Sequence, residues 1–289
     1  MGHIRDRMDE DLRLAKRSES TRSSYIGCTK RFVKFFMVSP EQLGEEHVRK
    51  FLLHLIDRPI SAGYYLQFLG ALKFLFGVTL GRPEVTARIP WPRSPYRRPS
   101  VMTRDEVARV LAAARTPYWQ AFLTTSYGAG LRRMEVAALR VQDIDGRSGL
   151  IRVANGKGGK AREVMLDPEL LVQLRAHWKH HHLRGSLLFP AQNPAGGWED
   201  RPVELDKASR AFREARLAAN IGRAVTLRSL RSSFATHLLE DGTDVFTLQQ
   251  LLGHTDLDTT RTYTEVRTDR IRATPSPLSK LPKLPKLPK

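Results

Sequence analysis

Apolar residues recur at helical spacing through three consecutive segments toward the C-terminal end of the chain. The first segment is defined by apolar positions three or four residues apart, the period of one buried helix face: Leu227, Leu230, Phe234 and Leu238. Thr226 is suited to cap the start of this helix, and Gly242 is suited to stop it. The same reasoning predicts a second helix between Asp244 and Gly253, and a third short segment that begins near Asp258.

The polar residues of these segments are suited to phosphate chemistry. Arg228 and Arg231 are three residues apart and are therefore neighbours on one helix. His254 follows the second helix, and Tyr263 lies in the third segment. A guanidinium is permanently charged and forks onto phosphate oxygens, a tyrosine hydroxyl can act as a nucleophile, and a histidine can transfer a proton near neutral pH. This combination predicts a site that opens a phosphodiester, not a carbonyl compound.

Residues 1–81 show helical periodicity with no competing strand alternation. A charged segment at 5–17 is followed by apolar-periodic segments that Ser20 or Thr21, Ser39 and Ser61 are suited to cap. The pattern predicts a bundle of about four helices. Basic residues are spread along these helices: Arg22, Lys30, Arg31, Lys34 and Lys73. They either form a DNA-facing surface or solvate the outside of the bundle, and the pattern alone does not choose between the two.

Residues 82–100 are rich in proline and arginine and are predicted to be a linker between two domains, because proline blocks helix continuation and stiffens the chain. The second domain is predicted to span residues 101–273. Thr103 and Glu106 form a capping-box pattern at its start. The repeated Leu-Pro-Lys sequence within residues 274–289 defeats helix and strand, and is expected to be an extended, disordered basic tail.

The second domain combines helices with one small antiparallel sheet. A helix over 118–127 is broken by glycines, after which Arg132 is expected in the first turn of a new helix, with Glu135 placed to orient it. Residues 150–154 and 163–166 are predicted to be the strands of a hairpin whose turn carries Lys157 and Lys160. Residues 187–190 and the glycine-rich 193–198 are expected to form a loop, and a helix over 205–219 presents Arg210 as a candidate DNA contact. The expected fold class is therefore mainly α with a small sheet (α+β).

The composition narrows the class of partner. The chain has 289 residues, and Lys+Arg 48 against Asp+Glu 30 gives a net charge of +18, which favours an anionic polymer such as nucleic acid. One cysteine excludes an internal disulfide and a cysteine-based zinc site. The histidines at 177 and 180–182 lack suitably spaced acidic or thiol ligands, so no metal site is predicted. The charged first residues and the absence of a long apolar run predict a cytoplasmic protein without a membrane anchor.

Four segments, in this order, resemble the sequence boxes of the tyrosine recombinases, the phage integrase family. They are YGAGLRRMEVAALRVQDID at 127–145, GKGGKAR at 156–162, LRSSFATHLLEDGTD at 230–244 and LLGHTDLDTTRTYT at 251–264. The resemblance is strong over residues 103–266 and weak before them. It implies an N-terminal helical core-binding domain and a C-terminal catalytic domain that together form a C-shaped clamp on DNA.

The resemblance also implies a mechanism, site-specific DNA recombination or integration through a 3′-phosphotyrosyl intermediate. Tyr263 would be the nucleophile, Arg132 and Arg231 the phosphate clamp, and Lys157 the general acid to the leaving 5′-oxygen. His254 would act as base or phosphate donor, with Glu135 in support. No ATP, metal or other cofactor is implied. The implied partner is double-stranded DNA with paired recombination half-sites, bound by a homotetramer.

One position departs from the family pattern. The family usually has a histidine three residues before the second arginine, where this chain has Arg228. Arginine can donate to a phosphate oxygen but cannot accept a proton, so Arg228 is either a purely electrostatic member of the site or a DNA contact. Ser232 is a milder departure at another position that is often histidine. Two alternatives therefore stay open: a type IB topoisomerase, which uses similar chemistry, and a DNA-binding protein with a weakened catalytic site.

Overall fold

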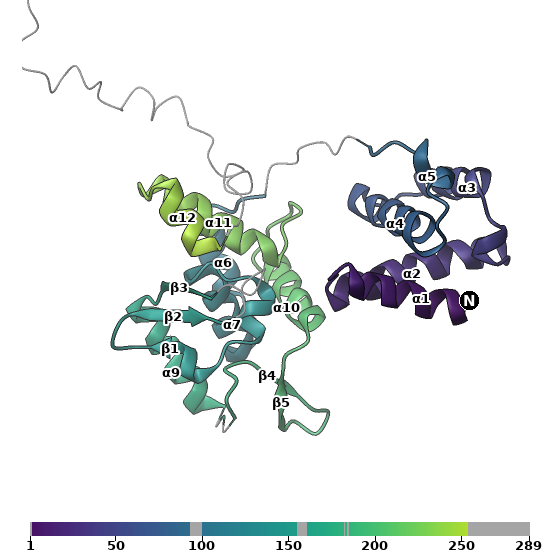
Figure 1. The fold of residues 1–289 in the computed structure, drawn as a ribbon. Helices are drawn as coiled ribbons and strands as arrows, with labels where there is room; N and C mark the ends of the chain where they lie inside the picture. Colours follow the sequence, from purple (N-terminus) through teal and green to yellow (C-terminus); the bar gives the residue numbers. More distant parts are fainter. Residues whose placement is uncertain (1, 93–99, 155–160, 182, 184, 254–289) are drawn as a thin grey trace, which may run out of the picture. The chain divides into compact units, whose positions relative to one another are not determined.

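The computed structural model describes residues 2–92, 100–154, 161–181, 183 and 185–253. Contacts within the chain divide it into two units, Met1–Tyr96 and Arg97–Lys289. Within the described residues, both are built mainly from helices, and the second also contains small antiparallel sheets (Figure 1). This confirms the predicted fold class. No helix of the described part is long and apolar enough to cross a membrane.

The first unit is a bundle of four helices with short additions. The helices are α1 (Gly2–Leu14), α2 (Glu19–Phe36), α3 (Glu45–Ile56) and α4 (Ala62–Phe74), with the 3-10 turn η1 (Pro40–Gln42), the π-helical turn η2 (Leu75–Thr79) and the short α5 (Glu84–Ala87). Phe32, Phe68 and Phe76 are fully buried in its core. Ser61 caps α4 as predicted, accepting from the Tyr64 amide, whereas α2 is capped by Ser18, earlier than expected.

The predicted linker begins too early in the chain. Val85 and Ile89 are buried in the core of the first unit, although both lie within the expected linker of residues 82–100. Arg82 Nη1 donates to the carbonyl oxygens of Glu41 at 2.8 Å and Leu43 at 3.0 Å. The prolines and arginines of this stretch indicated a linker, although it also contains Val85 and Ile89. Burial of these two side chains holds the stretch against the bundle, because each buried aliphatic side chain contributes roughly 1.5–3 kcal/mol.

The second unit is organised around α7 (Pro117–Gly128), which contacts five other helices (Figure 1). Those helices are α6 (Arg104–Ala112), α8 (Arg133–Ala137), α9 (Pro168–His180), α10 (Leu205–Ala218) and α11 (Leu227–Glu240). The predicted capping box at the start of α6 is present, because the Glu106 amide donates to Thr103 Oγ1 at 3.2 Å and the Thr103 amide donates to Glu106 Oε2 at 2.7 Å. Helix α12 (Val245–Leu252) packs against α11 and strand β3.

The predicted hairpin forms the main sheet. Strands β1 (Ile144–Asp145), β2 (Leu150–Val153) and β3 (Arg162–Met165) are antiparallel and ordered β1-β2-β3, after the turn η3 (Val141–Asp143). Ile151 pairs with Val164 in the register, and both are buried on one face. The hairpin turn, residues 155–160, lies outside the described residues.

A second hairpin occupies the segment that the sequence predicted as a loop. Strands β4 (Pro190–Gln192) and β5 (Trp198–Pro202) pair antiparallel, and the Asn193 amide donates to the Gly197 carbonyl at 2.9 Å to close the turn. Gly196 has a φ of +86°, which favours glycine. The glycines and proline that indicated a loop supply the turn, while the strands are too short to show alternation.

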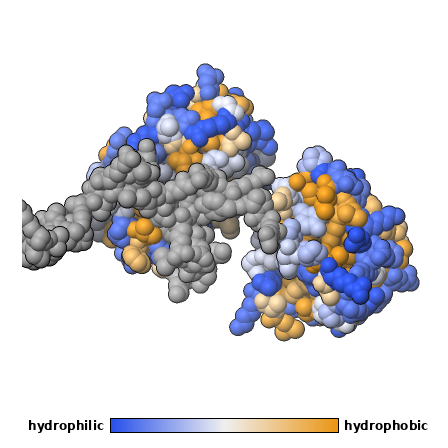
Figure 2. Space-filling view, turned by 90° about the horizontal axis from the view of Figure 1, so that it is seen from above, coloured by the Kyte–Doolittle hydropathy of each residue, from blue (hydrophilic) through white to orange (hydrophobic). Residues whose placement is uncertain are grey.

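The surface is not uniformly polar despite the high net charge. On the faces seen in Figure 2, hydrophobic areas interrupt hydrophilic ones in both units. In the first unit the exposed large apolar side chains include Phe35, Met37, Leu53 and Ile56. The exposed surface of the described residues therefore carries apolar as well as charged side chains.

Candidate active site

Glu135 lies at the centre of a cluster of arginines that we call the arginine cluster: Arg132, Arg162 and Arg231. The Arg132 amide donates to Glu135 Oε2 and its Nη1 donates to Oε1, both at 2.7 Å. Arg132 is the residue immediately before α8, not a member of its first turn as predicted. The carboxylate is thus fixed on Arg132 through both the backbone and the side chain.

Arg162 is the functional-site residue that the sequence reasoning missed. Its Nη1 donates to Glu135 Oε1 at 2.8 Å, and its Nη2 donates to Oε2 at 2.7 Å. Arg231 Nη1 lies 3.8 Å from Glu135 Oε2. Residues far apart in the chain therefore bring three guanidinium groups around one carboxylate, whose side chain is only 5% exposed.

The C-terminal end of α12 is held by the same three arginines. Arg162 Nε donates to the Leu251 carbonyl at 2.8 Å, and Arg132 Nη2 donates to the Gly253 carbonyl at 2.9 Å. Arg231 Nη2 donates to the Leu252 carbonyl between them. Carbonyl groups at a helix C-terminus lack partners within the helix and carry partial negative charge, which explains why cations gather there. Three consecutive carbonyls are each bound by a different arginine.

Glycines permit the close packing around the cluster. Arg231 Nη1 also donates to the Gly130 carbonyl at 2.8 Å. Gly130 has a φ of +58°, and a Cβ there would lie 2.3 Å from Phe234 Cδ1. Gly253 has a φ of +59° and ends α12 as predicted, after Asp244 caps its start by accepting from the Phe246 and Thr247 amides. Side chains at either glycine would disturb the carbonyl that an arginine binds.

Arg228 and Arg231 occupy different environments although the sequence predicted them to be neighbours. Arg231 is buried in the arginine cluster, whereas Arg228 is exposed on the same helix. Thr226 caps this helix as predicted, and its amide donates a hydrogen bond to Ser229 Oγ at 3.1 Å. The structure therefore separates the two arginines, one held by the protein and one facing outward.

The pKa of Glu135 reflects competition between burial and its arginines. Burial alone would raise the pKa, but hydrogen bonds from Arg162 and Arg132 and the charge of Arg162 lower it from 4.5 to about 2. Because the folded-state pKa is depressed, the carboxylate stabilises the fold above about pH 4.5, and this contribution is lost as the pH falls toward 2. A shift of this size corresponds to about 3 kcal/mol.

Glu135→Gln is therefore expected to lower the free energy of unfolding at pH 7 by about 3 kcal/mol, because it removes a buried charge and leaves three cations facing one another. The loss is expected to shrink as the pH is lowered from 4.5 toward 2, because the wild-type carboxylate takes up a proton first in the unfolded chain and in the folded chain only near pH 2. Urea unfolding at several pH values measures both effects.

The matched control is Glu204→Gln. Glu204 has a pKa of about 2 from Arg201 and Lys207, but its ion pairs are on the surface, where solvent screens them. Its loss is expected to change stability far less than the loss of Glu135. Equal effects of the two substitutions would show that burial of the arginine cluster contributes nothing.

Several predicted site residues lie outside the described residues: Lys157, Lys160, His254 and Tyr263. Their flanks are described. The strand β3 that follows the hairpin turn begins at Arg162, and Gly253 immediately precedes His254. Both flanks end in the arginine cluster, because Arg162 binds Glu135 and Gly253 is bound by Arg132.

The predicted DNA-facing residues of the first unit differ in their engagement. Lys73 is half-buried, with Nζ donating to the Thr86 carbonyl at 2.9 Å, and Arg22 pairs with Asp9 at 3.2 Å. Arg31 is exposed, with its guanidinium 5.7 Å from the centre of the Tyr64 ring. Lys30 and Lys34 are exposed on α2, and Arg210 is exposed on α10 in the second unit. Lys73 is thus engaged within its own unit, which weakens it as a candidate for DNA contact.

His177, one of the histidines that could suggest a metal site, has another partner. His177 Nε2 lies 2.8 Å from the Leu188 carbonyl, and the ring stacks on Phe189. Burial lowers the pKa of His177, and burial together with His177 and His180 lowers the pKa of His181 to about 4. Within the part of the chain that the structure describes, no group of three or more His, Cys, Asp or Glu side chains is placed to hold a metal ion.

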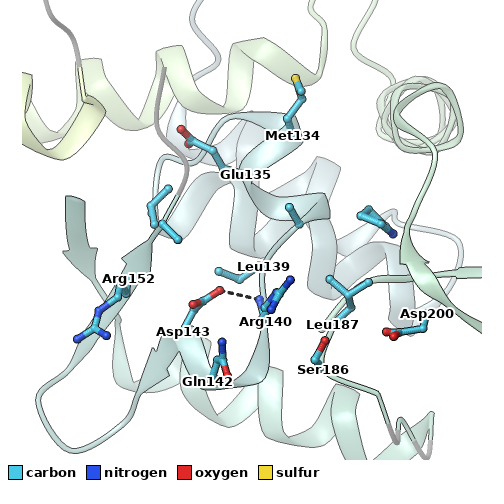
Figure 3. Close-up of a pocket in the computed structure, with 14 residues that line it drawn as sticks. Met134, Glu135, Leu139, Arg140, Gln142, Asp143, Arg152, Ser186, Leu187 and Asp200 are labelled. Atoms are coloured by element: carbon cyan, nitrogen blue, oxygen red, sulfur yellow. Dashed lines mark hydrogen bonds between the residues drawn. The ribbon is translucent and has the colours of Figure 1, made fainter. Parts of the chain in front are cut away.

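A cavity of about 640 Å³ adjoins the cluster on the side of the sheet (Figure 3). Glu135 and Met134 lie at one end, and Arg152 of β2 and Asp200 of β5 lie along its walls. Asp143 Oδ2 accepts a hydrogen bond from the Arg140 amide at 2.9 Å within it (Figure 3). Charged groups of both signs line the cavity.

Comparison with known proteins supplies the class. Residues 100–270 match the phage integrase family, and residues 4–84 match the N-terminal SAM-like domain of phage integrases. A putative integrase/recombinase of Sinorhizobium fredii is 37% identical over 283 residues, which cover 97% of this chain and 90% of the relative. The tyrosine recombinase XerA of Thermococcus kodakarensis is 32% identical over 246 residues, 83% of this chain and 84% of the relative.

The fold agrees with this relationship. A crystal structure of a lambda integrase (75–356) dimer bound to a COC′ core site superimposes with a TM-score of 0.73 at 19% identity, covering 93% of this chain and 96% of that one. The two proteins therefore share a fold. The chain belongs to the phage integrase family of tyrosine recombinases.

Proposed function

We propose that this protein is a site-specific DNA recombinase that cleaves and rejoins DNA strands through a covalent 3′-phosphotyrosyl intermediate. The observation that carries the proposal is the arginine cluster, in which Arg132 and Arg231 are held rigidly by Glu135 and by backbone carbonyls. Preorganised cations stabilise the charge that develops on phosphorus, because they need no reorganisation when the reaction occurs. The family and the relatives named integrase or recombinase support the same function.

Each step uses residues of this chain. The Tyr263 hydroxyl attacks the scissile phosphate and forms a bond to phosphorus, while the 5′-oxygen of the next nucleotide leaves. Arg132 and Arg231 bind the non-bridging oxygens of the pentavalent state. Lys157 gives a proton to the leaving 5′-oxygen. His254 accepts the tyrosine proton or donates to a phosphate oxygen, which matters because an unperturbed tyrosine has a pKa of about 10. The reverse reaction with a new 5′-hydroxyl rejoins the strand, so the phosphoester energy is conserved and ATP is not needed.

Arg228 is assigned to the DNA surface instead of the proton route. It is exposed, whereas the buried Arg231 of the same helix is held by Gly130 and Leu252. Arginine cannot accept a proton, so the proton route runs through His254 and Lys157. Lys30, Arg31, Lys34, Lys160 and Arg210 complete the proposed DNA-contacting set.

The proposed partner is double-stranded DNA with paired inverted half-sites, bound by four copies of the chain. Solved structures similar in fold include a lambda integrase tetramer bound to a Holliday junction, at 20% identity and a TM-score of 0.72. The net charge of +18 agrees with a polyanionic partner, and the proposed location is the cytoplasm, in association with DNA. Footprinting on the DNA that flanks the gene tests this directly, because paired protected half-sites are expected and scattered, unpaired protection would contradict it.

A nicked suicide duplex carrying the mapped half-sites tests the first chemical step. Wild-type protein is expected to form a DNA adduct that survives denaturant, because the short released strand diffuses away and rejoining stops. Relaxation of supercoiled DNA without any preferred site would favour the topoisomerase alternative. Tight half-site binding with no adduct would favour a DNA-binding protein with a weakened site.

Lys157→Ala is expected to slow cleavage by roughly 10²–10⁴-fold, the usual contribution of a positioned general acid. A substrate whose leaving atom is a 5′-bridging sulfur needs no proton, because a thiolate is a good leaving group. Single-turnover cleavage of this substrate by Lys157→Ala is expected to return close to the wild-type rate. A persistent defect on the sulfur substrate would remove Lys157 from the general-acid role.

A further inference from the structure

Arg162 joins three elements that carry different parts of the proposed site. It is the first residue of β3, directly after the hairpin segment that contains Lys157. Its guanidinium binds both oxygens of Glu135, and its Nε binds the Leu251 carbonyl of α12. Its side chain is only 9% exposed. Arg162 is therefore built into the protein at the point where the hairpin and α12 meet.

The hydrogen bonds from Arg162 to Glu135 weaken the attraction of this carboxylate for Arg132 and Arg231. Glu135 accepts two hydrogen bonds from the Arg162 guanidinium and one from the Arg132 guanidinium, while Arg231 Nη1 stays 3.8 Å away. A buried carboxylate without Arg162 would attract Arg132 and Arg231 more strongly, because a buried charge needs a close partner. Arg162 thus supplies the compensating charge that lets the two other guanidinium groups keep their positions.

Arg162 is also packed against the C-terminal end of α12, in addition to its hydrogen bond there. A Cβ at Gly253 would lie 2.9 Å from Arg162 Cδ, so the arginine stem lies directly against the backbone of Gly253. The Gly253 carbonyl is bound by Arg132, and the next residue is His254. The place from which the His254–Tyr263 segment departs is consequently set by the same side chain that borders the hairpin.

We propose that Arg162 is a positioning residue for strand cleavage: it neutralises Glu135 and locks the C-terminal end of α12 to β3, so that Arg132 and Arg231 hold the phosphate geometry. It does not touch the DNA. This proposal rests on the proposed function, and it adds a residue whose side chain binds Glu135 and the Leu251 carbonyl of α12.

The test compares Arg162→Met with wild type on the nicked suicide duplex in single-turnover cleavage. Loss of the lock displaces the phosphate-binding groups, and a displacement of about 1 Å can cost about 10²-fold, so the rate constant at saturating protein is expected to fall by roughly 10–100-fold. The dissociation constant for the half-site duplex is expected to change less than about threefold, because Arg162 does not contact DNA. An equal fall in affinity and no fall in the saturated rate would make Arg162 a DNA contact and overturn the proposal.

A pH profile distinguishes positioning from a general loss of structure. Three charged side chains face Glu135: Arg132, just before α8, Arg162 of β3 and Arg231 of α11. Helix α12 adds no charged side chain here and contributes backbone carbonyls that bind the arginines. Removing Arg162 raises the pKa of Glu135, so the cleavage rate of Arg162→Met is expected to gain an acid limb between about pH 4 and 6 that wild type lacks. Arg162→Lys keeps the charge without the fork, and its profile is expected to return toward wild type.

Arg109→Met is the matched control. Arg109 likewise pairs with a carboxylate, Asp105, and donates to a helix-terminal carbonyl, Ala219, in the same unit. It is expected to cleave at the wild-type rate with an unchanged pH profile. If wild type forms the adduct and Arg162→Met cleaves as fast as Arg109→Met, the positioning role of Arg162 is wrong, while the proposed function still stands.

A second readout needs no DNA and therefore separates this proposal from the proposed function. The pH dependence of urea unfolding reports the pKa of Glu135 in each variant. The destabilisation of Arg162→Met is expected to be smaller in the Glu135→Gln background than in wild type, because only the contacts of Arg162 with α12 then remain to be lost. Independent, additive effects of the two substitutions would show that Arg162 does not act through Glu135.

Discussion

Tyr263→Phe is expected to abolish the denaturant-stable DNA adduct, lowering its rate of formation by about 10⁴-fold or more. The substitution removes one oxygen, the atom that bonds to phosphorus in the proposed mechanism, and leaves the ring in place. Binding to the half-site duplex is expected to remain within about threefold of wild type, because a lost nucleophile affects the chemical step and not the ground state. Gel analysis of the suicide substrate after denaturation measures the adduct, and a binding assay on the same duplex measures affinity.

Tyr127→Phe is the control for loss of a tyrosine hydroxyl elsewhere in the second unit. Its hydroxyl lies 2.9 Å from His237 Nδ1 between α7 and α11, apart from the proposed nucleophile in sequence. Adduct formation is expected to persist in this variant. If Tyr263→Phe still formed the adduct, another side chain would be the nucleophile and the proposed mechanism would be wrong.

Arg231→Ala is expected to have the second-largest effect, a loss of about 10³-fold in single-turnover cleavage. Arg231 is the most constrained of the two proposed phosphate-binding arginines, because its guanidinium is bound by the Gly130 and Leu252 carbonyls and lies near Glu135. A donor held in this way stabilises charge on phosphorus without reorganising. Arg231→Lys keeps one charge but loses the planar fork, and is expected to recover only a small part of the activity.

Arg228→Ala, compared with Arg231→Ala, separates the effect of losing an exposed positive charge from the effect of losing a buried arginine that the protein holds in place on the same helix. Arg228 is exposed, so its loss is expected to weaken DNA binding at low salt and to lower the cleavage rate by about tenfold or less. Thermal unfolding of each variant checks that α11 is intact. Equal loss of cleavage in Arg228→Ala and Arg231→Ala would contradict the distinction drawn between the buried and the exposed arginine.

Local sequence signals predicted the elements of the fold well where the chain carries its own start and stop chemistry. Ser61, Thr103 and Asp244 cap helices as expected, and Gly253 ends α12 with a positive φ. The hairpin of β2 and β3 was predicted from alternation together with the glycine-rich turn between the two strands. The β4–β5 hairpin was missed, because its glycine-rich turn dominates strands too short to show a period.

The cluster of site residues depended on tertiary structure more than on any local pattern. Glu135 and Arg132 were predicted as a local pair, and the structure shows that pair. Arg162 was overlooked because its neighbours in sequence suggest only the base of a basic hairpin, and its partners Glu135 and Leu251 lie far away in the chain. The need for a partner from another element follows from the burial of Glu135, which only the folded chain shows.

The predicted end of the first unit, at residue 81, differs from the structure for a related reason. Proline and arginine give residues 82–100 the composition of a linker. Val85 and Ile89 nevertheless pack into the core of the first unit and hold the start of the segment there. Two apolar residues outweigh a loop-like composition once a core is available to bury them. Lys73 was predicted among the DNA-facing residues; its ammonium binds the Thr86 carbonyl, and contact with DNA stays a prediction.

Mass spectrometry of the trapped adduct tests the central claim most directly. Wild-type protein is reacted with the nicked suicide duplex, the complex is digested with protease and nuclease, and the modified peptide is sequenced. The account predicts one peptide, with a nucleotide joined through its 3′-phosphate to Tyr263. A nucleotide on any other residue, or a linkage through a 5′-phosphate to Tyr263, would contradict it.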